Sequence, residues 1–441
     1  MRYVGGDLQG QFMARVRGLD PQRCLAVPVD VGKWSAMALV ADHHGEVLVA
    51  PFEFALDEPG VRRLLSAIAG AESERNAALC RVGIEAAGHY HRTLVARLRA
   101  AEAEVVELNP AAVKEARSQQ LLRRLKSDER DLGAMAELLV RGAGRRPQVR
   151  DEAMAAQVAW AAHRRRMVAA QVALSNQVQG HLDLAFPGLC ACFDHILHTK
   201  AGGVIVRDLA DPDRMRRLGV EGLRRFVARR GVVLRRAKAE QLLAAAKVAL
   251  RLPAAERAPV AALLAADVAL LAAIGNEIRR AEDALADVLD ATPAGVLVSL
   301  PGIGVVRASA YGAAIGDPSR FPNAGAAYRA SGLVPAEYSS AGRRRGGQRI
   351  SREGSVELRS AIIELGRGLA GHDSDFASYR RRLRSAGKRP GVAAVAVGHR
   401  AHRLAFAMLR SQEPYDPQRW AAAVAGGPVM AKTGGRPTRT T

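Results

Sequence analysis

Four acidic residues of this chain have the types and positions that divalent metal sites need. Asp30 and Glu85 each end a short apolar run, and Asp128 and Asp131 are three residues apart in a stretch with helical character. Residues three apart on a helix share one face, so the last two acids point to the same side. Carboxylate oxygens are the ligands that Mg²⁺ prefers, and two such ions can stabilise the attacking and leaving oxygens of a phosphodiester. The four acids therefore predict an Mg²⁺ (or Mn²⁺) site for phosphodiester chemistry.

Strands and helices alternate around these acids. The apolar patterns predict strands over residues 24–30, 35–40, 47–51, 82–85 and 104–108. They predict helices over residues 57–70, over residues 91–103, and from Pro110 through Asp128 and Asp131. Three strands, then helix, strand, helix, strand and helix, is the order of a ribonuclease-H-like domain, whose mixed sheet gathers acids at one edge. The alternative is an ordinary α/β domain with scattered surface acids. It is disfavoured because charges that close apolar strands tend to lie at a sheet's functional end.

The charge of the chain points to a polyanionic partner. The chain has 65 Lys and Arg residues against 44 Asp and Glu, a net charge of +21. Such a chain is expected to bind nucleic acid through the phosphates, with counterion release dominating the affinity. A membrane surface, or a basic bias of the source proteome, would also explain the charge. Aromatic residues make up only 4% of the chain, too few for base stacking to be the main binding device.

The cysteines do not indicate a secreted protein. The four of them form no disulfide framework and no signal peptide is recognisable, so a cytoplasmic location is expected. Cys190 and Cys192, followed by His195 and His198, raise the alternative of a zinc site. Their spacing matches no common zinc signature and their neighbours are apolar, which favours packing.

Composition divides the chain into regions. Residues 1–23 carry no strong pattern and are expected to form a loose leader before an α/β domain over residues 24–148. Residues 149–290 are rich in Ala, Leu, Arg and Glu, which predicts long antiparallel helices of coiled-coil type. A mainly helical domain is expected over residues 291–412 and a disordered tail over residues 413–441.

The helical insert is interpreted either as a spacer or as an oligomerisation arm. Its long helices are expected over residues 155–184 and 262–289, with a shorter helical piece over residues 206–250. Its arginine clusters suit either nucleic acid or a solvated face. The longest apolar stretch, residues 260–274, contains Asp267 and is too short to span a bilayer, so no membrane is expected as a partner.

A short glycine motif lies near the start of the last domain. Pro301-Gly302-Ile303-Gly304 precedes a helix of small residues at 305–315, the pattern of a helix-hairpin-helix element that binds a phosphate through backbone N–H groups. A plain turn between two helices would have the same pattern. We expect Gly302 and Gly304 to contact the DNA backbone.

Two adjacent serines, Ser339 and Ser340, precede an intensely basic segment. The five arginines of residues 343–352, among which no acid occurs, are Arg343, Arg344, Arg345, Arg349 and Arg352. A serine becomes a nucleophile only where a base, a cation or a metal lowers the cost of losing its proton, and arginines can stabilise a phosphate's transition state. The residues alone leave open whether a serine attacks DNA or only hydrogen-bonds in a DNA-binding loop.

Three further side chains have types that could act as reactive groups. His89 and His91 follow the Glu85 strand closely and could touch metal or DNA, but a hydrogen-bonded structural role is favoured. Tyr379 is followed by several arginines. It is not favoured as a nucleophile, because a tyrosine beside arginines is common in DNA-binding helices.

Several short motifs occur in a characteristic order. They are Asp30-Val31-Gly32-Lys33, Ile84-Glu85-Ala86-Ala87-Gly88-His89-Tyr90, Leu108-Asn109-Pro110, Lys126-Ser127-Asp128-Glu129-Arg130-Asp131, Leu300-Pro301-Gly302-Ile303-Gly304, Gly332-Leu333-Val334-Pro335, Ser340-Ala341-Gly342, and Ile350-Ser351-Arg352-Glu353-Gly354 leading to Leu358-Arg359. Over about residues 24–412 the chain resembles the DEDD-type insertion-sequence transposases, a family of bridge-RNA-guided recombinases. The resemblance implies a RuvC-like N-terminal domain, a coiled-coil insert and a C-terminal transposase domain.

The resemblance also implies roles for individual residues. Asp30, Glu85, Asp128 and Asp131 match the family's metal-binding acids, and Ser340 matches its catalytic serine. The family usually has Ser-Gly where this chain has Ser340-Ala341-Gly342, so the adjacent Ser339 is a rival nucleophile, with Ser340 preferred. The residues expected to contact nucleic acid are Lys33, Lys126, Gly302, Gly304, Arg343, Arg344, Arg345, Arg349, Arg352 and Arg359.

A mechanism and a set of partners follow from the resemblance. A metal-assisted serine is expected to attack double-stranded target and donor DNA and to form a 5′-phosphoserine, guided by a noncoding bridge RNA. Dimers are expected to pair into a tetramer on DNA, with one subunit's acids acting beside another's serine. A metal-dependent nuclease of the Holliday-junction-resolvase kind, using activated water, is the main alternative. A non-catalytic nucleic-acid-binding protein is disfavoured because all four acids are intact.

Overall fold

The computed structural model describes residues 8–86, 88–120, 128–335, 339–340, 343–344 and 349–418. Contacts within the chain divide it into two compact units, residues 1–150 with 316–359 and residues 151–315 with 360–441. The residues expected to form the last domain, 291–412, are therefore divided between the two units. The predicted tail beyond residue 418 lies outside the described residues.

A five-stranded mixed sheet forms the centre of the first unit. Its strands are β1 (Cys24–Val31), β2 (Ser35–Asp42), β3 (Val47–Ala55), β4 (Leu79–Glu85) and β5 (Val105–Leu108), in the order β3-β2-β1-β4-β5. β1 and β2, and β2 and β3, pair antiparallel, whereas β4 is parallel to both β1 and β5. The prediction of a mixed α/β domain is confirmed.

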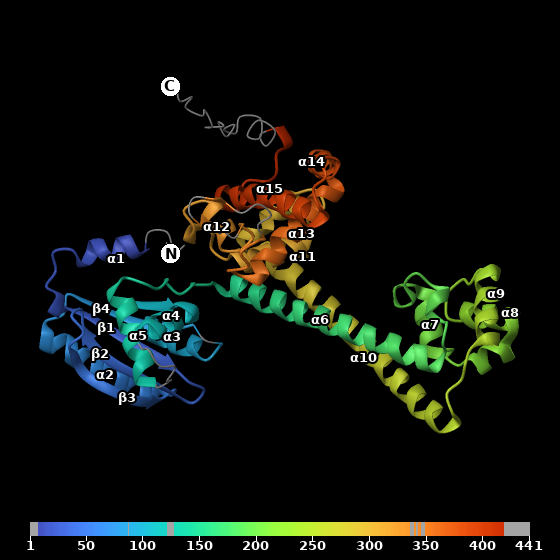
Figure 1. Ribbon diagram of the computed structural model, residues 1–441, viewed down its shortest axis with the longest axis horizontal. Helices are drawn as coiled ribbons and strands as arrows, with labels where there is room; N and C mark the ends of the chain where they lie inside the picture. The colour runs from blue at the N-terminus through green and yellow to red at the C-terminus, as the bar shows by residue number, and fades with distance from the viewer. Residues whose placement is uncertain are drawn as a thin grey trace. The chain divides into compact units, whose positions relative to one another are not determined.

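Helices cover both faces of this sheet (Figure 1). They are α2 (Glu58–Arg75), α3 (His91–Ala100), α4 (Pro110–Gln120) and α5 (Asp128–Val140). Asp57 caps α2 as predicted, since its Oδ1 accepts a hydrogen bond of 2.7 Å from the N–H of Gly60. The helix runs five residues further than predicted, to Arg75, and ends at Asn76 in the left-handed conformation.

Residues 8–16, within the predicted leader, form a helix, α1 (Leu8–Val16). Its buried Phe12 packs against Cys24 and Leu79, at the first residues of β1 and β4. The guanidinium of Arg81 lies 4.3 Å from the centre of the Phe12 ring. This helix therefore packs on the sheet domain, at the end opposite to the strand-closing acids.

The side chains of β1 alternate between two cores. Val27 and Val29 belong to the core with α2 and α3, whereas Ala26 belongs to the core with Met135 of α5. Successive side chains of a strand point to opposite faces, so Asp30, at an even position like Ala26, faces the side of the sheet that carries α4 and α5.

The same alternation directs Glu85 of β4. Val82 and Ile84 lie in the core with α2 and α3, so Gly83 and Glu85 face α5. At Gly83 the approach is so close that an added Cβ would lie 2.5 Å from Cδ2 of Leu139. Gly83 thereby lets α5 lie directly on β4.

Long helices dominate the second unit. The helices of this unit are α6 (Glu152–Ala185), α7 (Lys200–Asp208), α8 (Pro212–Ala228), α9 (Arg236–Val248), α10 (Ala254–Leu289), α11 (Val305–Ile315), α13 (Val356–His372), α14 (Ser374–Ser385) and α15 (Pro390–Ser411). The first residues of α13 belong to the first unit, as does the whole of α12 (Ala324–Arg329). α6 and α10 lie side by side (Figure 1). Polar contacts join His163 to Glu277 and His181 to Asp267, so residue numbers fall along α10 as they rise along α6. The pair is therefore antiparallel, and the prediction of a mostly helical remainder is confirmed.

Asp267 is buried between α6 and α10. Its carboxylate lies 2.7 Å from Nδ1 of His181 and accepts hydrogen bonds of 3.0 and 3.1 Å from Nε2 of Gln177.

α10 is longer than predicted, and by length and composition alone it is the one helix of the described residues that could cross a membrane. The contacts of Asp267 give this buried charge in the apolar part of the helix partners inside the protein.

The cysteines of the second unit lie in packing. Cys192 is buried in a core with Leu189 and Ile196, and Phe193 packs against it. The Sγ of Cys192 donates a weak hydrogen bond of 3.7 Å to the carbonyl oxygen of Gly188. The interpretation of this segment as packing is confirmed.

The glycine turn after residue 300 packs on α13. A 3₁₀ helix, Pro293–Ser299, precedes the turn and α11 follows it, so the first arm of the predicted hairpin is not an α-helix. Gly302 has φ +73°, and an added Cβ would lie 2.3 Å from Nδ1 of His372. Glycine is therefore needed here both for its conformation and for the close approach of α13.

Replacing Gly83 by alanine should loosen the contact between β4 and α5. The added Cβ overlaps Leu139, and overpacking of this kind costs about 1–3 kcal/mol. Hydrogen exchange of peptides from β4 and α5 measures the loss. Gly70→Ala in α2, where nothing lies within 4 Å, is the control and should stabilise by about 0.5–1 kcal/mol. Equal protection of Gly83→Ala and the native chain would contradict this packing.

Removing the imidazole in His181→Ala should destabilise the pairing of α6 and α10. The buried carboxylate of Asp267 then keeps only Gln177, which costs about 1–3 kcal/mol. His163→Ala removes a more exposed partner of Glu277 and should cost less than about 1 kcal/mol. Hydrogen exchange in α6 and α10 checks the order of the two variants. A larger effect of His163→Ala would show that Asp267 is not the critical contact.

Candidate active site

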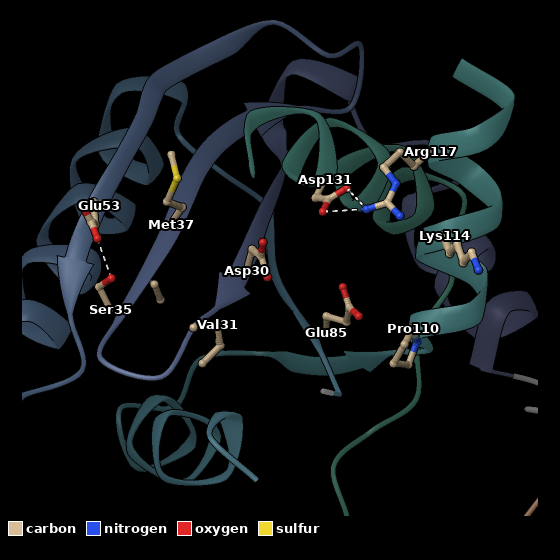
Figure 2. Close-up of a pocket in the computed structure, with 12 residues that line it drawn as sticks. Asp30, Val31, Ser35, Met37, Glu53, Glu85, Pro110, Lys114, Arg117 and Asp131 are labelled. Carbon is tan, nitrogen blue, oxygen red and sulfur yellow. Dashed lines mark hydrogen bonds and ion pairs between the residues drawn. The ribbon is translucent and has the colours of Figure 1, made fainter. Parts of the chain in front are cut away.

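A pocket of about 650 Å³ lies in the first unit, at the end of β1 and β4. Figure 2 shows Asp30, Glu85 and Asp131 with their carboxylates directed into it. Lys114 and Arg117 of α4 also line the pocket. Three of the four predicted acids are thus gathered in one place, together with two cations.

Strand pairing brings Asp30 and Glu85 together. The parallel register of β1 and β4 pairs Val29 with Ile84. Asp30 and Glu85 are the next residues of the two strands, and alternation turns both toward α5. The two carboxylates therefore come from neighbouring strands at the same level of the sheet.

Packing of α5 on the sheet positions Asp131. The adjacent Leu132 is fully buried against Leu39 and Ala41 of β2. Asp128 is the first residue of α5, so it lies on the same helix as Asp131, as predicted. Only its backbone is described, so the place of its carboxylate stays a prediction.

An ion pair holds the Asp131 carboxylate. Nη1 of Arg117 donates to both oxygens, at 2.6 and 2.9 Å, and the Asp131 side chain is only 5% exposed. A charge-assisted hydrogen bond of this kind neutralises a carboxylate that is removed from water. Any cation that binds Asp131 in this pocket must therefore compete with Arg117.

The chemistry of the donors fits a hard divalent cation. Asp30, Glu85 and Asp131 supply carboxylate oxygens, which Mg²⁺ and Mn²⁺ prefer. Within the described part of the chain, no three acidic, histidine or cysteine side chains are grouped closely enough to hold a metal ion. The three acids share a pocket, but Asp131 is held in an ion pair with Arg117. A metal that uses Asp131 as a ligand would therefore bind after this ion pair rearranges.

The segment that carries Ser339 and Ser340, called here the serine segment, lies between two stretches of backbone that contact each other. These contacts form a stem, which joins residues 334–335 to residues 350–351. Residues Pro335 and Ile350 form an isolated antiparallel bridge, and the N–H of Ser351 donates to the carbonyl oxygen of Val334 at 2.8 Å. Between them, the short strands β6 (Ser339–Ser340) and β7 (Arg343–Arg344) pair antiparallel, with Ser340 opposite Arg343. The backbone therefore brings the two serines opposite two of the predicted DNA-binding arginines.

Arg352 and Arg359 contribute to this stem. The N–H of Arg352 donates to the carbonyl oxygen of Gly332 at 3.0 Å, and Arg352 has the unusual φ of +60°. Nη1 of Arg359 donates to the carbonyl oxygen of Ser331 at 2.9 Å and to that of Arg352 at 3.4 Å. Arg359 thus braces the stem, while the side chains of Arg352 and Arg349 are exposed.

Several predicted site residues are not part of the described pocket. Its lining comes from residues 30–131 alone, so neither serine is among the described lining. Lys126 and Arg345 lie outside the described residues, and the side chains of Ser339, Ser340, Arg343 and Arg344 are not described. Gly302 and Gly304 belong to the second unit. Their contacts with nucleic acid stay predictions.

His91 and Tyr379 each lie against another side chain of the protein. His91 is buried at the start of α3, with Nε2 at 3.8 Å from Oε1 of Glu107, and it does not line the acid pocket. The guanidinium of Arg400 lies 3.6 Å from the centre of the Tyr379 ring. The position of His91 agrees with the structural role favoured for it, and the ring of Tyr379 packs against an arginine.

Sequence reasoning missed Lys114, Arg117 and Glu53 as pocket residues. A signal was present for the first two, because residues three apart in a helix that starts at Pro110 share one face. Glu53 accepts a hydrogen bond from the hydroxyl of Ser35, across the β2–β3 pair. Its place could be found only from the strand register.

Comparisons with known proteins assign a family to both parts of the chain. A DEDD-type transposase model matches residues 27–187, and a model described as the transposase IS116/IS110/IS902 family matches residues 294–381. Over 147 residues the chain is 30% identical to an insertion element IS110 uncharacterized 43.6 kDa protein of Streptomyces coelicolor. That alignment covers 33% of this chain and 36% of the relative, about a third of the relative's length.

A mixed sheet with acids at one edge, followed by a mostly helical remainder, defines the class: these are the features of a DEDD-type transposase. The chain belongs to the IS116/IS110/IS902 family of transposases. The resemblance that its motifs suggested is therefore confirmed. The first matched span contains Asp30, Glu85, Asp128 and Asp131, and the second contains Ser340.

Replacing Arg117 by methionine should make the stability of the first unit depend on metal. Without metal, the buried Asp131 loses its partner, and the variant should melt at a lower temperature than the native chain. Mn²⁺ should then raise the melting temperature more in Arg117→Met than in the native chain, because the ion no longer competes with a guanidinium.

Two controls accompany this measurement. Lys114→Met removes an exposed cation from the same pocket and should change little. Adding Asp30→Asn to Arg117→Met should abolish the effect of Mn²⁺. An equal Mn²⁺ shift with and without Arg117 would show that Asp131 is not a ligand.

Proposed function

We propose that this protein is the DNA transposase of an insertion sequence and that it cuts and rejoins DNA through a serine nucleophile, Ser340. The observation that carries the proposal is the pocket shared by Asp30, Glu85 and Asp131, in a chain matched by two transposase family models. The net charge of +21 supports a nucleic-acid substrate. The position of Ser340 opposite Arg343 in a paired backbone supports a role for the serine beside a phosphate.

The proposed reaction conserves the energy of the DNA backbone. The hydroxyl oxygen of Ser340 forms a bond to the phosphorus of a phosphodiester, and the bond from phosphorus to the 3′ oxygen breaks. The serine proton leaves to a base or water, and the 3′ oxygen takes up a proton. Attack by a 3′ hydroxyl of another strand on the 5′-phosphoserine reverses these steps and rejoins DNA without an external energy source.

The acids and the arginines have separate tasks in this reaction. Asp30, Glu85, Asp128 and Asp131 hold Mg²⁺ or Mn²⁺, which would ease loss of the serine proton and neutralise charge on the phosphate. The arginines that follow Ser340, together with Lys33, Lys126, Arg352 and Arg359, bind the DNA backbone. The backbone N–H groups at Gly302 and Gly304 contact a further phosphate.

Guidance by RNA and assembly on DNA complete the proposal. A structured noncoding bridge RNA pairs with target and donor DNA, so that base pairing reads sequence while the protein reads shape and backbone. The small share of aromatic residues, 4%, supports recognition through the backbone.

Dimers pair into a tetramer, in which one subunit's acids act beside another's serine. The protein acts in the bacterial cytoplasm, at the nucleoid.

A metal-dependent nuclease of the resolvase kind is the second candidate. The same pocket suits it, because carboxylates that hold a divalent cation can also activate a water molecule. In that reaction water attacks the phosphodiester and Ser340 only binds. The two candidates differ in their products, since the nuclease leaves free 5′ phosphates and no protein–DNA adduct.

Covalent trapping separates the two candidates. The full chain, its flanking noncoding RNA and labelled element-junction DNA are incubated with Mg²⁺ and resolved on a denaturing gel, beside the variants Ser340→Ala, Ser339→Ala and Asp30→Ala. We expect a labelled adduct that Ser340→Ala and Asp30→Ala reduce at least about 100-fold, since each removes a group needed in the transition state. Ser339→Ala should keep the adduct.

Other outcomes would change the assignment. An adduct lost in Ser339→Ala but kept in Ser340→Ala would move the nucleophile by one residue. Cleavage without an adduct, insensitive to Ser340→Ala and abolished by Asp30→Ala, would establish the nuclease. An adduct that forms without the RNA would remove the guide from the reaction.

A further inference from the structure

An almost fully exposed tryptophan stands beside the acid pocket. Trp34 lies between β1 and β2 and is 76% exposed, whereas Tyr90, the other exposed aromatic among the large apolar side chains of the described residues, is 36% exposed. An indole is a large apolar surface that contributes most when it is covered. The chain has three tryptophans in all, so this exposure falls on a rare side chain.

The turn that carries Trp34 is fixed by backbone hydrogen bonds. The N–H of Gly32 donates to the carbonyl oxygen of Ser35 at 2.9 Å, and the N–H of Leu56 donates to the carbonyl oxygen of Trp34 at 3.0 Å. Gly32 and Ser35 both line the acid pocket. The turn between Gly32 and Ser35 therefore holds the backbone of Trp34 at the rim of the pocket.

A cation already lies against the indole. Nζ of Lys33 is 4.7 Å from the centre of the Trp34 ring. A flat aromatic surface next to an ammonium group matches the two parts of a nucleotide, because the base stacks on the ring and the phosphate pairs with the cation. Lys33 is therefore placed to pair with the phosphate of a nucleotide whose base stacks on Trp34.

We propose that Trp34 stacks on an unpaired DNA base next to the phosphodiester that is cleaved, and that it thereby positions that phosphodiester over the acid pocket. The proposal rests on the proposed function, in that it places a DNA strand at this pocket. Stacking requires a base that is unpaired or at a strand end, because the faces of paired bases inside a duplex are covered by their neighbours. Trp34 is a positioning residue and takes no part in bond making.

Fluorescence of Trp34 gives a direct test that does not depend on cleavage. Trp160→Phe and Trp420→Phe in the full chain leave Trp34 as the single tryptophan. An added Asp30→Asn suppresses turnover. The probes are an element-junction duplex with a short single-stranded gap, the intact duplex, and an RNA oligonucleotide of the same sequence as the gap. We expect the gapped DNA to quench Trp34 emission, with binding followed independently by fluorescence anisotropy of labelled DNA.

Substitutions at Trp34 distinguish stacking from bulk. Trp34→Leu keeps an apolar side chain without an aromatic face and should weaken binding of gapped DNA by a factor of about 5 to 100. Trp34→Phe should restore most of the affinity. Val47→Ala is the control, because Val47 is also exposed but pairs with Ala41, at the other end of β2. It should leave the affinity unchanged.

The outcomes separate this proposal from the proposed function. Quenching by gapped DNA, together with no covalent adduct from the chain that keeps Asp30, would support stacking and overturn the serine mechanism. An adduct with unchanged Trp34 emission at saturating DNA would do the reverse. Equal affinities of Trp34→Leu and Trp34→Phe, or quenching by the RNA and not by the gapped DNA, would overturn DNA base stacking. A shift of the emission to shorter wavelengths that grows with protein concentration in the absence of DNA would show that a second copy covers Trp34, and would also overturn it.

Discussion

The acid pocket depends on the register between two parallel strands. β1 and β4 pair so that Val29 lies beside Ile84, and the next residue of each strand is an acid. A shift of one residue in either strand would turn its acid into the core with α2 and α3, where a carboxylate without partners costs several kcal/mol. The apolar residues that fix the register therefore also fix the distance between Asp30 and Glu85. The same strand register is therefore required both to bury the apolar residues of the core and to bring the two acids together.

Gathering acids in one pocket creates repulsion that the fold must offset. Arg117 offsets it at Asp131, through two short hydrogen bonds to a carboxylate that is nearly removed from water. The same guanidinium limits what Asp131 can bind. A divalent cation that takes Asp131 as a ligand releases Arg117 into a pocket whose proposed substrate is a phosphate. The released guanidinium would then face an anion that it can bind through charge-assisted hydrogen bonds. Metal binding and phosphate binding would thus be linked through one residue of α4.

Local patterns made much of this fold predictable, and long-range packing explains what was missed. The strands, the cap at Asp57 and the two acids that close strands follow from alternation and from neighbours in sequence. The ion pair of Arg117 with Asp131 does not, because it depends on how α4 and α5 pack against each other. Helix α1 was missed for a similar reason, since Phe12 gains its partners only when β1 and β4 are side by side. The sequence of the turn at Gly302 predicts a phosphate site, yet one side of the turn is covered by Gly368 and His372 of α13, which are distant in the sequence.

The acids and the serine are held by different physical means. The acids stand on a sheet and on a helix packed against it, which are rigid elements suited to a fixed ligand geometry. The serine segment lies inside a stem closed by a few backbone hydrogen bonds, with Arg352 held at a positive φ that costs about 1–3 kcal/mol in a non-glycine residue. Such a conformation persists only where its surroundings enforce it, and Gly332 and Arg359 supply the contacts that do so. In the proposed mechanism this separation would have a use, because a recombinase must not cut before its DNA partners are assembled. The acids would be in place in every copy, and cleavage would wait until the serine segment of another subunit reaches them.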